Sequence, residues 1–123
     1  MTTTTAAAPP PATADYSDPR CAPASAELVA QVAAGLTAEG NQLANGTVIS
    51  EGGITYFGAT TVDAVGDMDA RSDVWIVRDG AVYSSTGGAR GNSNFPRASD
   101  ALGISPGDPI VTAVDTCVID LTE

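Results

Sequence analysis

The sequence contains no histidine and no lysine, and these absences remove most common catalytic arrangements. Without histidine, neither a Ser-His-Asp triad nor a Cys-His pair can form, and zinc binding is disfavoured. Without lysine, Ser-Lys catalysis, Schiff-base chemistry and the P-loop are excluded. No glycine-rich dinucleotide motif follows a strand in a βαβ unit. Only carboxylate, hydroxyl and arginine chemistry remains, so we predict no enzyme activity, no catalytic residues and no cofactor.

Positive charge and long apolar runs are also scarce. Five arginines face fifteen acidic residues, which gives a net charge of −10. Such a chain repels nucleic-acid phosphates and anionic lipid headgroups, so we expect neither as a partner. No apolar run reaches the roughly 18 residues that span a bilayer, so we expect no direct membrane insertion. The first residues show no secretory signal. We interpret the chain as a fragment whose anchor or signal is missing; the alternative is a cytosolic protein that starts at Met1.

Only two cysteines are present, and they bracket almost everything that can fold. Residues 1–20 are rich in Thr, Ala and Pro, which predicts a disordered linker, and residues 21–123 then form a single domain. Stalks of this composition commonly carry domains of the cell envelope. We therefore predict a Cys21–Cys117 disulfide in an extracytoplasmic protein, secreted or anchored through the missing segment. Two separate free thiols in a reducing cytosol are the alternative.

The first half of the domain predicts one helix and one hairpin. Apolar residues recur at helical spacing over residues 25–38. Two runs rich in β-branched and aromatic residues, 47–50 and 54–62, then flank a Gly-Gly pair. A tight turn at these glycines places Val48 opposite Phe57.

A second hairpin is predicted by an Asp-Gly pair at positions 79–80, between the runs 73–78 and 81–84. Asp and Gly both tolerate the positive φ that such a turn requires. The register places Trp75 and Tyr83 on opposite faces, and both faces are largely apolar. The hairpin is therefore either central and covered on both sides, or it carries an exposed apolar patch.

The rest of the chain predicts a loop and two helical segments. Residues 85–94 read as an irregular, mobile loop, and residues 95–102 as a short turn or helix. The segment from Asp108 favours a helix over a strand, although its β-branched residues keep the strand as an alternative. We thus expect an α+β fold: an antiparallel sheet of about four strands packed by an N-terminal helix, with a C-terminal helix tied to the domain start by the disulfide.

A resemblance is carried by the order of these segments. The tail is followed by Cys21, a helix reading LVAQVAAGLT, an Asn-Gly-Thr-Val strand, an Ile-Thr-Tyr-Phe-Gly-Ala strand, the hairpin with Val74-Trp75, and a late helix with Cys117. This order resembles the C-terminal extracytoplasmic domains of actinobacterial membrane-anchored or secreted proteins of unknown function. The resemblance covers about residues 21–120 and implies an extracytoplasmic α+β domain. It includes no catalytic motif, so it implies no functional residues.

An acidic loop over residues 63–70 is one candidate functional feature. Carboxylate oxygens suit calcium, but the spacing is not that of an EF-hand and no glutamate closes the loop. We favour a solvated acidic loop over a metal site, with Asp67 and Asp69 as the weak metal candidates. The same stretch includes Asp63, and Asp73 follows it closely.

The other candidates lie in the second half of the chain. The glycine-rich residues 87–91 could hold an anion through exposed amides beside Arg90, although a flexible loop is the favoured interpretation. Trp75 and Tyr83 could form a platform for a sugar or peptide, although packing in the core is more common for such residues. Trp75, Tyr83 and Arg90 therefore make up the candidate binding surface.

These observations predict a non-enzymatic extracytoplasmic binding or accessory module of the cell envelope. Its partner would be a protein, a peptide or a glycan, and the acidic surface favours basic partners. The alternatives are a purely structural displayed domain and a small enzyme that uses carboxylates or Arg90. A binding module should expose an apolar patch or pocket around Trp75 or Tyr83, whereas a structural module should bury both.

Overall fold

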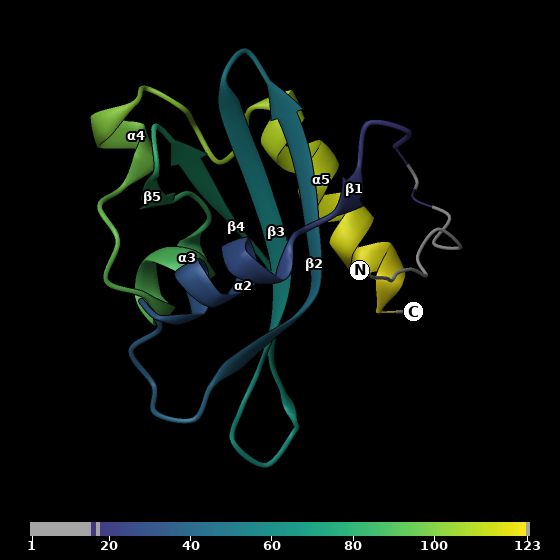
Figure 1. Cartoon of the computed structure of the whole chain (residues 1–123), viewed down its shortest axis with the longest axis vertical. Helices are drawn as coiled ribbons and strands as arrows, with labels where there is room; N and C mark the ends of the chain where they lie inside the picture. The colour runs from purple at the N-terminus through teal and green to yellow at the C-terminus, as the bar shows by residue number, and fades with distance from the viewer. Residues whose placement is uncertain (1–15, 17, 123) are drawn as a thin grey trace, which may run out of the picture.

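The computed structural model describes Tyr16 and residues 18–122, and it shows one antiparallel sheet packed by helices (Figure 1). Five strands lie in the order β1-β2-β3-β4-β5. The strands are β1 (Ala22–Pro23), β2 (Gln42–Glu51), β3 (Ile54–Val62), β4 (Met68–Arg78) and β5 (Ala81–Ser84). The helices are α2 (Ala26–Ala33), α3 (Gly87–Asn92), α4 (Ala98–Ala101) and α5 (Pro109–Leu121). The α+β fold is confirmed, whereas most of the predicted linker lies outside the described residues.

Both predicted hairpins are present. Val48 lies opposite Phe57 across β2 and β3, as the alternating pattern required. The β4–β5 turn uses Asp79 and Gly80, whose φ angles of 52° and 81° lie in the left-handed region. These residue types tolerate that region at little cost, which explains why the turn forms at this point. The short strand β1, which the sequence pattern did not predict, adds a fifth strand beside β2.

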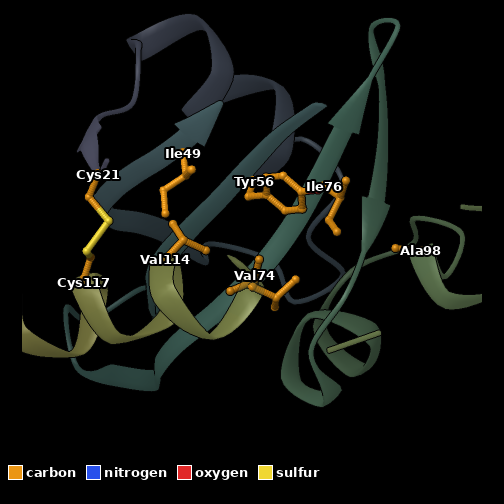
Figure 2. Close-up of a cluster of buried hydrophobic side chains, with 9 residues drawn as sticks. Cys21, Ile49, Tyr56, Val74, Ile76, Ala98, Val114 and Cys117 are labelled. Carbon is orange, nitrogen blue, oxygen red and sulfur yellow. A yellow bond between two sulfur atoms is a disulfide. The ribbon is translucent and has the colours of Figure 1, made fainter. Parts of the chain in front are cut away.

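The two faces of the sheet each carry a separate core. On one face α5 crosses β2, β3 and β4, and Figure 2 shows part of this cluster. On the other face α2 and α3 cover the second cluster. Both faces of the β4–β5 hairpin are therefore covered, although the hairpin lies at one edge of the sheet and is not central. The first core contains Ile49, Tyr56, Val74, Ile76, Val111 and Val114. The second contains Val32, Phe57, Ala59, Trp75, Val82 and Ala89.

The last segment is a helix, so the strand alternative is excluded. Asp108 occupies the N-cap position and Pro109 opens the first turn, where its missing N–H costs nothing. The helix approaches the sheet closely at Gly58, where an added Cβ would lie 2.8 Å from Cγ2 of Val118. The small residue in β3 thus allows the apolar face of α5 to reach the strands.

The predicted disulfide between Cys21 and Cys117 is present and joins the start of the domain to α5 (Figure 2). Both cysteines are buried. Just before this bond, Asp18 and Arg20 form an ion pair at 2.8 Å, and Tyr16 packs against the α5 core. Disulfides of this kind are typical of proteins that fold in an oxidising environment.

Helix α2 ends at Ala33, earlier than the predicted residue 38. The chain after it pairs with a distant segment: Asn94 N–H donates to the Gly35 carbonyl, and Thr37 N–H donates to the Asn92 carbonyl. An extended segment cannot make these bonds and also continue a helix. The tertiary pairing therefore determines where α2 stops.

The prediction of an irregular loop over residues 85–94 was wrong, because α3 forms within it. Its three glycines disfavour a helix by local propensity, so contacts with the rest of the domain must supply the stability. The predicted bounds of the acidic loop, residues 63–70, were also too wide. Its last residues, from Met68 onward, belong to β4.

Candidate functional site

The indole of Trp75 is fully buried between the sheet and α3. Its ring centroid lies 5.9 Å from that of Phe57. Its Nε1 donates a 3.0 Å hydrogen bond to Oγ of Ser93, the residue directly after α3. The Ser93 hydroxyl in turn donates to the carbonyl oxygen of Ala89 inside α3. The protein's single tryptophan is thus covered by α3 and does not lie on an exposed binding surface.

The two other residues of the candidate surface lie elsewhere. Tyr83 is half-buried beside the core on the α5 side of the sheet, the face opposite Trp75. Nε of Arg90 donates to the Ser85 carbonyl at 3.1 Å, and its Nη2 lies 3.4 Å from Oγ of Ser99. Arg90 therefore links α3 to α4 and to the end of β5. The structure does not bring Trp75 and Tyr83 together in one surface.

The acidic residues after β3 make local contacts. Oδ1 of Asp63 accepts hydrogen bonds from the backbone N–H groups of Val65 and Asp67, at 3.0 Å and 2.9 Å. Oδ2 of Asp69 accepts from Nδ2 of Asn41 at 3.4 Å. In the part of the chain that the structure describes, no three His, Cys, Asp or Glu side chains gather closely enough to hold a metal ion.

Asp73 lies apart from these residues, within β4 and beneath α3, and it is only 4% exposed. Its Oδ1 accepts a 2.8 Å hydrogen bond from Oγ1 of Thr86, the N-cap residue of α3. The carboxylate also accepts from the backbone N–H of Ala89. The Thr86 hydroxyl itself accepts from the N–H of Val74 at 3.0 Å. Asp73 thus anchors the first turn of α3 to β4.

The protonation of Asp73 is controlled by its burial. Removal from water raises the pKa of this carboxyl above its ordinary value of 3.8, because the charged form loses its hydration. The hydrogen bond from Thr86 and that from the Ala89 N–H oppose the rise, while the charges of Asp115 and Asp69 add to it. The other oxygen, Oδ2, has no hydrogen-bond partner among the described residues. A buried carboxyl with a raised pKa is typical of functional sites, which makes Asp73 the candidate site.

We expect Gly88→Ala to destabilise the protein and Gly87→Ala, in the same helix, to leave it unchanged or stabilise it. A Cβ on Gly88 would collide with the Asp73 carboxyl, 2.3 Å from Oδ1, whereas a Cβ on Gly87 meets nothing within 4 Å. The collision should cost about 1–3 kcal/mol, and the free position should gain up to about 1 kcal/mol from alanine's helix propensity. Urea unfolding of both variants measures the difference. Equal effects at the two positions would contradict the contact.

We expect Asp73→Asn to flatten part of the pH dependence of stability. The native carboxyl holds its proton more tightly than the unfolded chain does, so the native state binds more protons above the ordinary pKa of 3.8. The free energy of unfolding therefore falls as pH rises through the raised pKa of Asp73. Asparagine cannot ionise and removes this contribution, whereas Asp79→Asn, at a side chain 91% exposed, should retain it. Urea unfolding at a series of pH values tests this, and identical slopes in Asp73→Asn and wild type would contradict it.

The sequence contains one indication that Asp73 belongs to a strand and not to the neighbouring acidic loop. Asp73, Trp75 and Val77 alternate along one strand, so their side chains point to the same face. The alternation therefore places the carboxyl on the same face as two apolar side chains, but it does not show that this end of the face is covered. The covering helix carried no comparable signal, since its glycines predict a loop.

The chain matches no protein-family model, no curated protein and no solved structure. Within the described residues, no helix combines the length and the apolar character that crossing a membrane requires. The site is therefore interpreted from its own residues and contacts.

Proposed function

We propose that this domain is a non-enzymatic module of the cell envelope that works outside the cytoplasm, as a binding or accessory domain. The disulfide between Cys21 and Cys117 is the observation that carries the proposal. Disulfides persist in oxidising compartments and are rare in the cytosol. This one joins residues 96 positions apart, so it closes the domain from its first strand to its last helix.

The charge of the domain supports a basic partner. Its net charge is −10, and many carboxylates lie exposed on the surface. Such a field concentrates cationic groups near the protein and repels anionic ones. The proposed partner is therefore a protein or peptide that is rich in basic residues. Exposed acidic residues include Glu27, Glu39, Glu51, Asp67, Asp69, Asp79 and Asp100.

The compartment can be tested by lysing cells directly into denaturant with an alkylating reagent, which reaches buried thiols, and then measuring the intact mass of the recovered protein. We expect no alkylation before reduction and two alkylated cysteines after it. Alkylation of Cys21 and Cys117 without reductant would contradict the extracytoplasmic proposal, because both thiols would then be free in the cell.

The partner class can be tested with a fluorescent oligo-arginine peptide and an oligo-glutamate peptide of the same length. We expect the first to bind, with an affinity that falls as salt is raised, because exposed charges are screened. The second should not bind. Equal binding of both peptides, or binding that salt does not change, would contradict a charge-selected partner.

The burial of Trp75 favours a second candidate, a purely structural displayed domain. An aromatic binding platform needs an exposed ring face, but Trp75 exposes none of its surface and Tyr83 is half-buried. The two candidates differ in the peptide experiment. A domain with an intact disulfide that binds neither peptide would favour the structural role.

A further inference from the structure

Helix α3 covers Trp75, yet it has little stability of its own. It has six residues, of which three are glycine, and Thr86 makes no side-chain hydrogen bond to the helix. Each interior glycine costs about 1 kcal/mol relative to alanine, and so short a helix does not persist alone in water. Its place over the sheet therefore depends on tertiary contacts, which it makes with β4, with the segment after α2 and, through Arg90, with α4.

The side-chain hydrogen bonds to β4 lie at the two ends of α3. At the start, the Asp73 carboxyl accepts hydrogen bonds from Thr86 and from the Ala89 N–H. At the end, Ser93 accepts a hydrogen bond from Trp75. Asp73 and Trp75 are two positions apart on the same face of β4. The contact at Asp73 thus helps to hold the helix that covers Trp75.

Among the described residues, the charges that act on the Asp73 carboxyl are those of Asp115 on α5 and Asp69 on β4, and both are negative. Arg71, two positions before Asp73 on β4, donates from Nε to Oγ1 of Thr122. On β3 the opposite residue is Ala59. On α3 the charged residue is Arg90, whose guanidinium is directed to oxygens at the end of β5 and on α4. Ionised Asp73 therefore places a negative charge in the core with only hydrogen bonds to offset it.

We propose that α3 is a proton-controlled cover over Trp75, closed when the Asp73 carboxyl is neutral and loosened when it ionises. The neutral carboxyl still accepts hydrogen bonds at Oδ1 and brings no charge into the core. On ionisation the proton leaves to solvent, and the carboxylate regains hydration if α3 lifts from β4. Because α3 is the weakest of the covering elements, it is the one that moves. Lifting it exposes the indole of Trp75.

The pH dependence of α3 opening follows from the difference between the pKa of Asp73 in the open state and in the closed state. Between the pKa of Asp73 in the open state and its raised pKa in the closed state, the opening equilibrium constant should rise about tenfold per pH unit. Amides that exchange through this opening should lose protection by the same factor. This proposal does not depend on where the domain is located or on what it binds. It can therefore fail while the proposed envelope role holds, and the envelope role can fail while this proposal holds.

The test is native-state amide hydrogen exchange from about pH 4 to pH 8, corrected for the intrinsic pH dependence of exchange. We expect the protection of the Ala89 and Arg90 amides to fall with pH relative to that of the β3 amides. Acrylamide quenching of Trp75, the single tryptophan, should increase over the same range. In Asp73→Asn the fall in protection should disappear, and in the control Asp79→Asn it should remain.

Two results would overturn the proposal. The first is a wild-type protein in which α3 and β3 amides keep a constant ratio of protection across the pH range. The second is an Asp73→Asn variant with the same slope as wild type. Should Asp73→Asn fail to fold by circular dichroism, the wild-type exchange ratio decides the question alone.

Discussion

Replacing Cys21 and Cys117 with alanine is expected to lower the free energy of unfolding by about 2–5 kcal/mol, the range for loss of a native disulfide in a small domain. The bond spans 96 residues of sequence, so its loss frees almost the whole unfolded chain from one constraint. In the native state its loss also releases β1, which has only two residues and pairs only with β2. Denaturant unfolding of the oxidised wild type and the double variant measures the effect.

The single variants Cys21→Ala and Cys117→Ala separate the bond from the packing of its side chains. Either substitution breaks the same bond, so each should lose nearly as much stability as the double variant. Cys117 is fully buried within the α5 core, so its single variant also reports a lost packing contact. A loss confined to Cys117→Ala, with Cys21→Ala close to wild type, would mean that packing rather than the covalent link stabilises the fold.

Trp75→Ala is expected to cost about 3–5 kcal/mol, the range for removing a large buried aromatic side chain. The ring contributes to the core beneath α3, contacts Phe57 and bonds to Ser93. Its removal opens a cavity and also detaches the end of α3, so the covering helix should lose order. Circular dichroism during urea unfolding measures the loss of stability, because this variant lacks the single tryptophan that would serve as the fluorescence probe.

One further variant tests the hydrogen bond of Trp75, and another serves as a surface control. Trp75→Phe keeps an aromatic ring in the core but removes the hydrogen bond to Ser93, so its cost should lie between wild type and Trp75→Ala. Val65→Ala, at a side chain 81% exposed in the turn after β3, should stay within about 0.5 kcal/mol of wild type. A loss below about 1 kcal/mol in Trp75→Ala would contradict the central place of this residue in the core.

The strands and their register could be predicted because their signals are local. Alternating apolar residues and the turn pairs Gly-Gly and Asp-Gly act over a few neighbours, and they correctly placed Val48 opposite Phe57. The starts of α2 and α5 also depend on neighbouring residues: Ser25 accepts a hydrogen bond from the Leu28 N–H at 3.1 Å, and Asp108 precedes Pro109. None of these features requires knowledge of distant parts of the chain.

The candidate site could be predicted only in part. Trp75 and Tyr83 were correctly placed on opposite faces, but their exposure depended on which helices cover each face. Asp73 was grouped with the acidic loop, because its burial becomes apparent only when α3 is known to lie above it. The role of Arg90 was missed for the same reason, since its contacts with Ser85 and with α4 exist only in the folded chain.

The amino-acid sequence alone determined the alternation of the strands and the tight turns, and it favoured the final helix and the Cys21–Cys117 pairing, because each depends on neighbouring residues or on residue chemistry. The tertiary structure alone decided where α2 ends, that glycines 87, 88 and 91 are helical, and that the Asp73 carboxyl is buried. These outcomes oppose local propensity, and they arise because contacts between segments far apart in sequence outweigh it.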